Sequence, residues 1–144
     1  MKALTLYQPY ATAIADCHKK FETRSWNTKY RGEIAIHAGA KLVPWPLSEA
    51  TGDLICRLYP SGKMLPRGAV VCVADLYDVW TTEFITNLRQ PIASADILLG
   101  DYSPGRFAFA LRNVRKLKEP VEARGFQMLW TVPPDVEARV RAQL

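Results

Sequence analysis

The sequence predicts a mixed α+β domain, a small β-barrel of mixed or antiparallel strands flanked by helices. Three observations indicate this fold class. Five or six segments have the composition of strands, unequal spacers separate them, and helical patterns stand near both ends of the chain without regular β-α-β alternation. With 144 residues, the chain is long enough to bury a sizeable core, so residues 1–144 are expected to form a single domain.

The first predicted elements are a strand over residues 3–7 and a helix that begins at Pro9. Proline suits the first turn of a helix because its missing N–H would be unpaired there. Apolar residues then recur at helical spacing and make one face of the helix: Tyr10, Ala13, Ile14 and Cys17. We expect this helix to end near His18.

Two more strands are predicted before residue 40. Residues 22–26 read as extended, and residues 33–37 alternate, which places Ile34 and Ile36 on the inner face and His37 on the opposite one. A break over residues 44–46 follows, and then a helix capped by Ser48 that runs to about Tyr59.

The second half contains the strongest strand patterns. Residues 69–79 are dense in Val, Ala and Leu and predict a central strand. The later expectations are a short helix over 81–88, a turn over 94–99, a loop over 100–105, a strand over 107–112, one or two short strands over 121–130 and a terminal helix over 133–144.

Composition excludes several classes of protein. Hydrophobic residues make up 49% and charged residues 23%, and no run approaches the ~20 apolar residues that span a bilayer, so a membrane is not an expected partner. The three cysteines are isolated and only two histidines are present, so neither a disulfide framework nor a metal or other cofactor is predicted. Reduced thiols and an N-terminus without a signal-like apolar core indicate a cytoplasmic location.

The net charge of +5 is concentrated in two segments. Residues 19–31 carry five bases and one acid, and residues 106–124 carry six bases and two acids, whereas residues 32–105 carry five bases and eight acids. If folding brings the two basic segments together, they form a basic cleft suited to the phosphates of nucleic acid. The alternative is that the two basic segments are ordinary solvent-exposed surface without a binding role.

The segment that begins at Lys19 combines both charge signs with aromatic residues. In an extended stretch Glu22, Arg24 and Trp26 share one face. An indole that stacks, a guanidinium that meets anions or carbonyls, and a carboxylate that accepts N–H bonds can together hold a nucleobase. An exposed edge strand with an ordinary Glu/Arg pair is the alternative.

Several motifs together resemble the ASCH domain (activating-signal-cointegrator homology), a branch of the PUA-like superfamily. They are Gln8-Pro9-Tyr10-Ala11, the segment from Lys19 to Trp26, Tyr30-Arg31-Gly32, and Gly100-Asp101-Tyr102 with Arg106-Phe107. The family signature G-x-K-x-x-E-x-R is matched from Cys17 to Arg24, with Cys17 in the place of glycine. Because cysteine takes positive φ only at a cost, we expect a looser or shifted turn there.

The resemblance spans Leu4 to about Trp130 and implies a barrel with a cleft beside the signature and a role with RNA or nucleotides. Lys19, Glu22 and Arg24 are the candidate catalytic residues. Candidate binding residues match or flank the motifs or complete the basic and aromatic set: Gln8, Tyr10, Lys20, Ser25, Trp26, Tyr30, Arg31, His37, Asp101, Tyr102, Ser103 and Arg106.

Three functions follow from these residues. The first is recognition of single-stranded RNA or of a nucleotide or nucleoside, with Tyr10 and Trp26 stacking on bases and the lysines and arginines neutralising phosphate. The second is metal-independent RNA cleavage, in which Glu22 or His37 moves protons, the cations stabilise the phosphate, and Tyr30, Tyr102 or Ser103 assists. The third is amide hydrolysis of an N4-acylated cytidine. Glu22 stands where the family's amidohydrolases carry their threonine nucleophile, which weighs against this third function.

Overall fold

The computed structural model describes residues 1–42, 47–60, 64–88 and 92–144. Within these residues the elements follow one another as β1 (Lys2–Gln8), α1 (Tyr10–Ala15), β2 (Phe21–Arg24), β3 (Gly32–Leu42), α2 (Glu49–Leu58), β4 (Ala69–Thr81), α3 (Thr82–Thr86), α4 (Ser94–Leu98), β5 (Phe107–Glu122), β6 (Leu129–Thr131) and α5 (Pro134–Arg141). The predicted break at 44–46 lies outside the described residues, as do residues 61–63 of the loop that follows α2.

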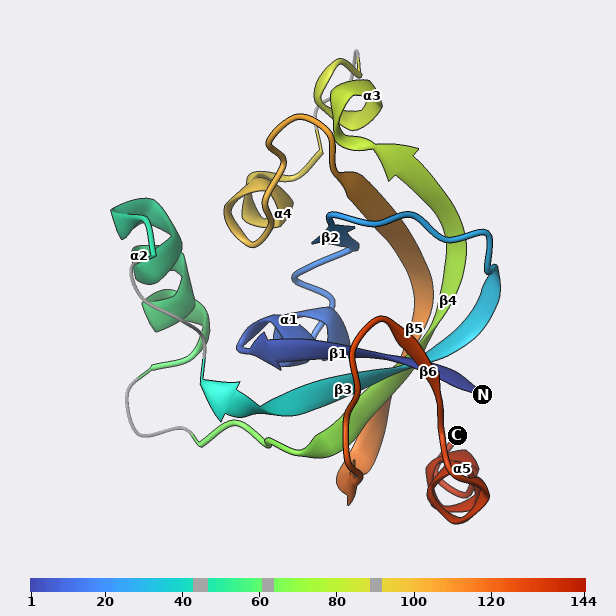
Figure 1. Cartoon of the computed structure of the whole chain (residues 1–144). Coiled ribbons are helices and arrows are strands. Elements are labelled where there is room, and N and C mark those ends of the chain that lie inside the picture. Colours follow the sequence, from blue (N-terminus) through green and yellow to red (C-terminus); the bar gives the residue numbers. More distant parts are fainter. Residues whose placement is uncertain (43–46, 61–63, 89–91) are drawn as a thin grey trace.

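The strands form one six-stranded sheet in the order β2-β5-β4-β3-β1-β6. Only the β1–β3 pair is parallel among these ladders, and the others are antiparallel. Figure 1 shows the long strands β3, β4 and β5 curving around α1. The mixed α+β class is therefore confirmed. The closed barrel is not, because in the described part of the chain the short strands β2 and β6 are opposite edges of an open hydrogen-bonded sheet.

Side-chain alternation along the strands builds a core on each face of the sheet. Leu4 and the predicted inward pair Ile34 and Ile36 lie on the face that packs against α1. Ala3 and Ala35 lie on the other face, in a cluster completed by the apolar residues of α5. Each strand thus contributes to both layers, as period-two patterning requires.

The turn after α1 is tighter than the sequence indicated. The helix ends at Ala15 and not near His18, and Cys17 takes a left-handed backbone conformation with φ of 61°. The backbone N–H groups of His18 and Lys19 both donate to the carbonyl of Ala13, at 2.8 and 3.1 Å. Of the two expected alternatives, a looser or a shifted turn, the looser one is wrong, because Cys17 adopts the conformation that glycine favours. This also leaves Cys17 exposed, outside the apolar face predicted for it.

The other helices lie close to their predicted positions, whereas two strands differ. Ser48 caps α2 by accepting from the backbone N–H of Thr51 at 3.1 Å, and residues 94–98 form a helical turn. The strand predicted over 107–112 continues through Glu122 as β5, because local shifts in register keep it paired with β4. Of the predicted strands over 121–130, only β6 is separate. No helix among the described residues is long and apolar enough to cross a bilayer.

Candidate functional site

A cleft of about 1490 Å³ opens beside the signature. It runs from β2 and the segment 98–102 on one side to the segment 123–128 on the other. Nine of the predicted site residues line it: Tyr10, Glu22, Arg24, Ser25, Trp26, His37, Asp101, Tyr102 and Arg106.

Glu22 is the centre of the charged wall of this cleft. Its Oε2 lies 3.2 Å from Lys19 Nζ, and its Oε1 lies 3.0 Å from Arg24 Nε. The Lys19 ammonium is fully buried and donates to the carbonyl of Leu99 at 2.7 Å, and Arg24 Nη2 donates to the carbonyl of Thr5 at 2.7 Å. Both cations are therefore fixed by backbone carbonyls, and they fix the carboxylate in turn. The Lys19 ammonium is thus engaged within the protein, by the Leu99 carbonyl and by Glu22.

The start of β2 is held by Asp96 of α4. The carboxylate of Asp96 is almost fully buried, and its Oδ1 accepts from the backbone N–H groups of Lys20 and Phe21 at 2.6 and 3.1 Å. The N–H of Phe21 belongs to the edge strand β2, and that of Lys20 directly precedes it. The contact sets the position of Glu22, one residue further on.

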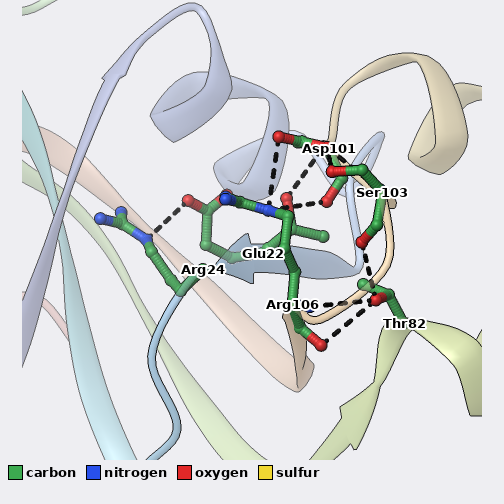
Figure 2. A network of polar contacts seen from close by, with 7 residues as sticks. Glu22, Arg24, Thr82, Asp101, Ser103 and Arg106 are labelled. Carbon is green, nitrogen blue, oxygen red and sulfur yellow. Dashed lines mark hydrogen bonds and ion pairs between the residues drawn. The ribbon is translucent and has the colours of Figure 1, made fainter.

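A second charged pair lies at the start of β5. Arg106 Nε is 3.4 Å from the Asp101 carboxylate, and Figure 2 shows this pair with the Arg24–Glu22 pair. Hydrogen bonds from the hydroxyl and the backbone N–H of Ser103 lower the pKa of Asp101. Thr82 fixes this loop by donating its hydroxyl to the Ser103 carbonyl at 2.9 Å (Figure 2).

Three aromatic side chains add an apolar surface to the charged wall. Trp26 packs edge-on against Phe109, with ring centroids 5.0 Å apart, and remains partly exposed to the cleft. Burial and the Glu22 carboxylate raise the pKa of Tyr10. Burial, followed by the effect of nearby carboxylates, also raises the pKa of Tyr102. The Tyr102 hydroxyl is buried and has no hydrogen-bond partner among the described residues.

His37 lies in the part of the cleft bounded by segment 123–128. It is 1% exposed, and its Nε2 lies 2.9 Å from the carbonyl of Ala123, so the neutral ring donates there. Burial lowers the pKa of His37 although the carbonyl acts in the opposite direction. Gly125 passes so close that a Cβ there would lie 2.4 Å from His37 Cε1 and 2.8 Å from Thr5 Oγ1. His37 is thus a buried wall residue with a backbone partner.

The remaining predicted site residues do not line the cleft. Gln8 accepts from the backbone N–H of Thr12 and caps α1. Tyr30 donates its hydroxyl to the Glu33 carbonyl, and Arg31 pairs with Asp78 at 3.3 Å. The last two are Lys20, which lines a different groove, and Ser103, which supports Asp101 as described above.

Sequence reasoning missed four contributors to this site. Asp96 and the carbonyl of Leu99 hold the signature from a distant segment. Thr23 was not among the predicted site residues, and its buried hydroxyl oxygen accepts from the backbone N–H of Asp101 at 2.8 Å. Segment 123–128 adds the half-exposed ring of Phe126 to the cleft. Among these four contributors, only Asp96 left a signal in the sequence, as an acidic residue at the start of a short helix.

The expectation of a basic cleft is correct only in part. Antiparallel pairing of β2 with β5 does bring the two basic segments together. Two of the cations at the cleft, Arg24 and Arg106, are paired with acids of the same cleft. Lys41 and Arg124 also line the cleft, and neither forms an ion pair among the described residues. The wall around Glu22 is therefore compensated, whereas the cleft as a whole keeps two cations that have no acidic partner in the described part of the chain.

A sequence profile of the ASCH domain matches residues 4–126 of the chain. Among solved structures, the ASCH protein of Zymomonas mobilis is similar with a TM-score of 0.60 and 16% identity, covering 98% of this chain and 93% of that one. A Ser-to-Ala variant of that protein gives a TM-score of 0.59, with 16% identity and 98% and 94% coverage. A Tyr-to-Phe variant gives 0.58, with 16% identity and 98% and 96% coverage. No curated protein sequence matches the chain.

Proposed function

Because the chain belongs to the ASCH-domain family, which supports a general role with nucleic acids, we propose that its cleft binds single-stranded RNA by enclosing an unstacked base. The observation that carries this proposal is the fixed carboxylate of Glu22 in a wall that also contains the rings of Tyr10 and Trp26. Single-stranded RNA is recognised mainly by stacking on aromatic rings and by hydrogen bonds to exposed base edges.

The chemistry of the wall suits a base better than a phosphate. Glu22 is an acceptor for the N–H groups of a base edge, and its two cationic neighbours leave its orientation little freedom. Stacking on one aromatic side chain contributes ~1–3 kcal/mol per base. The Tyr102 hydroxyl supplies a donor that the described residues do not use.

The proposal is tested most sharply by Tyr102→Phe. This change removes a hydroxyl without a partner, so the free energy of unfolding should remain the same or rise slightly. If the hydroxyl donates to bound RNA, the Kd measured by fluorescence anisotropy should rise by roughly fivefold, the equivalent of about 1 kcal/mol.

Tyr30→Phe is the matched control, because it removes a hydroxyl whose partner lies outside the cleft. It should lower stability and leave the Kd unchanged. Equal Kd values for the parent protein and Tyr102→Phe would remove this hydroxyl from the ligand contacts, and a parent protein that does not retain single-stranded RNA would refute the proposed function.

Hydrolysis is a second candidate function, favoured by the 3.2 Å contact between Lys19 Nζ and Glu22 Oε2 at the cleft wall. For a metal-independent ribonuclease, Arg24 and Arg106 are better placed than Lys19 to meet a phosphate, since the lysine is buried. For an amidohydrolase acting on an N4-acylated cytidine, the hydroxyl of Thr23 is already engaged by Asp101. Water activated by Glu22 is the remaining route.

These functions separate in one experiment with the chelator EDTA. End-labelled single-stranded RNA that is shortened supports a ribonuclease, and acid released from N4-acetylcytidine supports an amidohydrolase. RNA that is retained on a filter but remains intact supports recognition alone.

A further inference from the structure

A second groove, of about 490 Å³, lies between the turn that follows α1 and the middle of β5. One wall is the turn with Cys17 and Lys20, and the other contains Arg112, Asn113 and Tyr77. Lys19 also lines this groove, while its ammonium reaches Glu22 in the cleft. Among the described residues, the groove and the cleft have no lining residue in common, and the Lys19–Glu22 contact connects them.

The groove arises from an irregularity in the β4–β5 ladder. Val73 is opposite Arg115 and Asp75 is opposite Arg112, so two residues of β5 face a single residue of β4 between these pairs. Asn113, one of those two, takes φ of 50°. A bulge of this kind bends the strand and redirects its side chains, which opens space beside the α1 turn.

The groove also holds cations that the fold leaves uncompensated. Among the described residues, neither Lys20 nor Arg112 lies within ion-pair distance of an acid, and no acidic side chain lines the groove. Two other cations of the same basic segments are paired, Arg31 with Asp78 and Lys116 with Asp16.

Aromatic side chains extend from the same groove along β4. The Arg112 guanidinium lies over the ring of Tyr77, 4.9 Å from its centroid. Tyr77 contacts Trp80 edge-on at 6.5 Å between centroids, and Trp80 contacts Phe84 at 5.7 Å. Tyr77 is 36% exposed and Phe84 54%. Unpaired cations beside exposed rings are what a surface that binds single-stranded nucleic acid requires.

We propose that this groove binds the phosphate backbone of the single-stranded RNA whose base enters the cleft, with Lys20 and Arg112 as the phosphate contacts. The inference rests on the proposed function and adds a division of labour to it. The cleft, in which Glu22 is fixed between Lys19 and Arg24, recognises a base, and the groove, whose cations have no acidic partner among the described residues, neutralises phosphate. Tyr77 and the stacked Arg112 guanidinium offer a surface for a neighbouring base.

The dependence of RNA affinity on salt tests this division. Kd is measured by fluorescence anisotropy over a series of salt concentrations, with a labelled single-stranded RNA of about 12 nucleotides, within the usual site size. For single strands the slope of log affinity against log salt is about −0.7 for each neutralised phosphate. Lys20→Ala and Arg112→Ala should each make the slope shallower by about 0.7, whatever the sequence of the RNA.

Two controls define the outcomes. Lys118→Ala removes the same charge from an exposed position of β5 away from the groove and should leave the slope unchanged. Tyr102→Phe should weaken binding without changing the slope.

Two results would overturn the groove proposal and leave the cleft proposal standing. One is binding by the parent protein with the same slope in both groove variants, and the other is an equal loss of slope in Lys118→Ala. No binding by the parent protein overturns both. Both substituted groove residues are exposed, so the variants are expected to fold.

Discussion

Lys19 and Lys20 are neighbours in the chain and differ in almost every physical respect. The Lys19 ammonium is buried between the Leu99 carbonyl and Glu22, whereas Lys20 is exposed beside Arg112 in the second groove. In the described part of the chain, only the backbone of Lys20 is held, its N–H by Asp96 and its carbonyl by the N–H of Leu111. The same side chain thus serves to orient a carboxylate at one position and to offer a free positive charge at the next.

The comparison shows that net charge and location of charge have separate meanings. A buried ion pair repays its desolvation only with good geometry and further hydrogen bonds, and Lys19 and Glu22 have both. A free surface cation costs little and retains its attraction for phosphate. This difference is the basis of the proposal that the cleft recognises a base and the groove binds phosphate.

The largest expected effect on stability comes from substituting Lys19, the buried one of the two lysines. Lys19→Ala leaves the Glu22 carboxylate and the Leu99 carbonyl without their common partner, and should lower the free energy of unfolding by about 3 kcal/mol or more. Urea denaturation followed by circular dichroism measures this change. Lys20→Ala is the matched control and should change stability by less than about 0.5 kcal/mol.

Equal effects of the two substitutions would contradict the assignment of a buried, structural Lys19. The expected loss of stability also means that an inactive Lys19→Ala protein does not identify a catalytic lysine. Any comparison of activity needs a fold measurement on the same sample, and this is the reason for using Tyr102→Phe as the probe of the cleft.

How far the sequence predicts this site depends on how local each interaction is. Lys19, Glu22 and Arg24 lie within one short motif. Strand alternation predicted that Glu22 and Arg24 share a face, and the resemblance to the ASCH signature added Lys19. Asp96 is 76 residues from the N–H group of Lys20 that it binds, and neither composition nor periodicity indicates such a contact.

The partners of charged residues are also hidden from sequence reasoning. The two basic segments were identified from their composition, but whether a cation is paired depends on acids that tertiary folding brings close. The carbonyl of Leu99 cannot be recognised from the sequence as a partner of Lys19, because every residue type carries a backbone carbonyl. The open sheet was missed for a similar reason, because strand patterns show which residues alternate and not whether the two edge strands meet.

The pH dependence of stability tests whether the buried ring of His37 is neutral. Burial lowers the pKa of His37 in the folded protein, so the unfolded chain takes up a proton first as the pH falls through the ordinary value of about 6.5. The free energy of unfolding should be unaffected by this group above that pH and should decrease below it, until the folded ring is protonated as well.

Urea unfolding at a pH of about 7.5 and of about 5.5 measures this loss, whose slope cannot exceed ~1.4 kcal/mol per pH unit for a single group. His37→Gln should make the two values more nearly equal. His18→Gln is the control for the exposed histidine and should retain the loss seen in the parent protein. A parent protein as stable at the lower pH as at the higher one would contradict the buried neutral ring.

The smallest expected effect concerns the turn that sends Lys19 inward and Lys20 outward. A residue other than glycine pays ~1–2 kcal/mol for a left-handed conformation, and glycine pays roughly 0.5–1 kcal/mol in lost chain entropy. Cys17→Gly should therefore raise the free energy of unfolding by about 0.5–1 kcal/mol, measured by the urea midpoint at constant slope. Asn113→Gly is the matched control in the opposite wall of the groove. Asparagine tolerates this conformation, and the change also removes the hydrogen bond that Asn113 Nδ2 donates to Asp75 at 2.7 Å, so Asn113→Gly should bring no gain. A loss of stability in Cys17→Gly would show that the thiol makes contacts in the groove that outweigh the backbone cost.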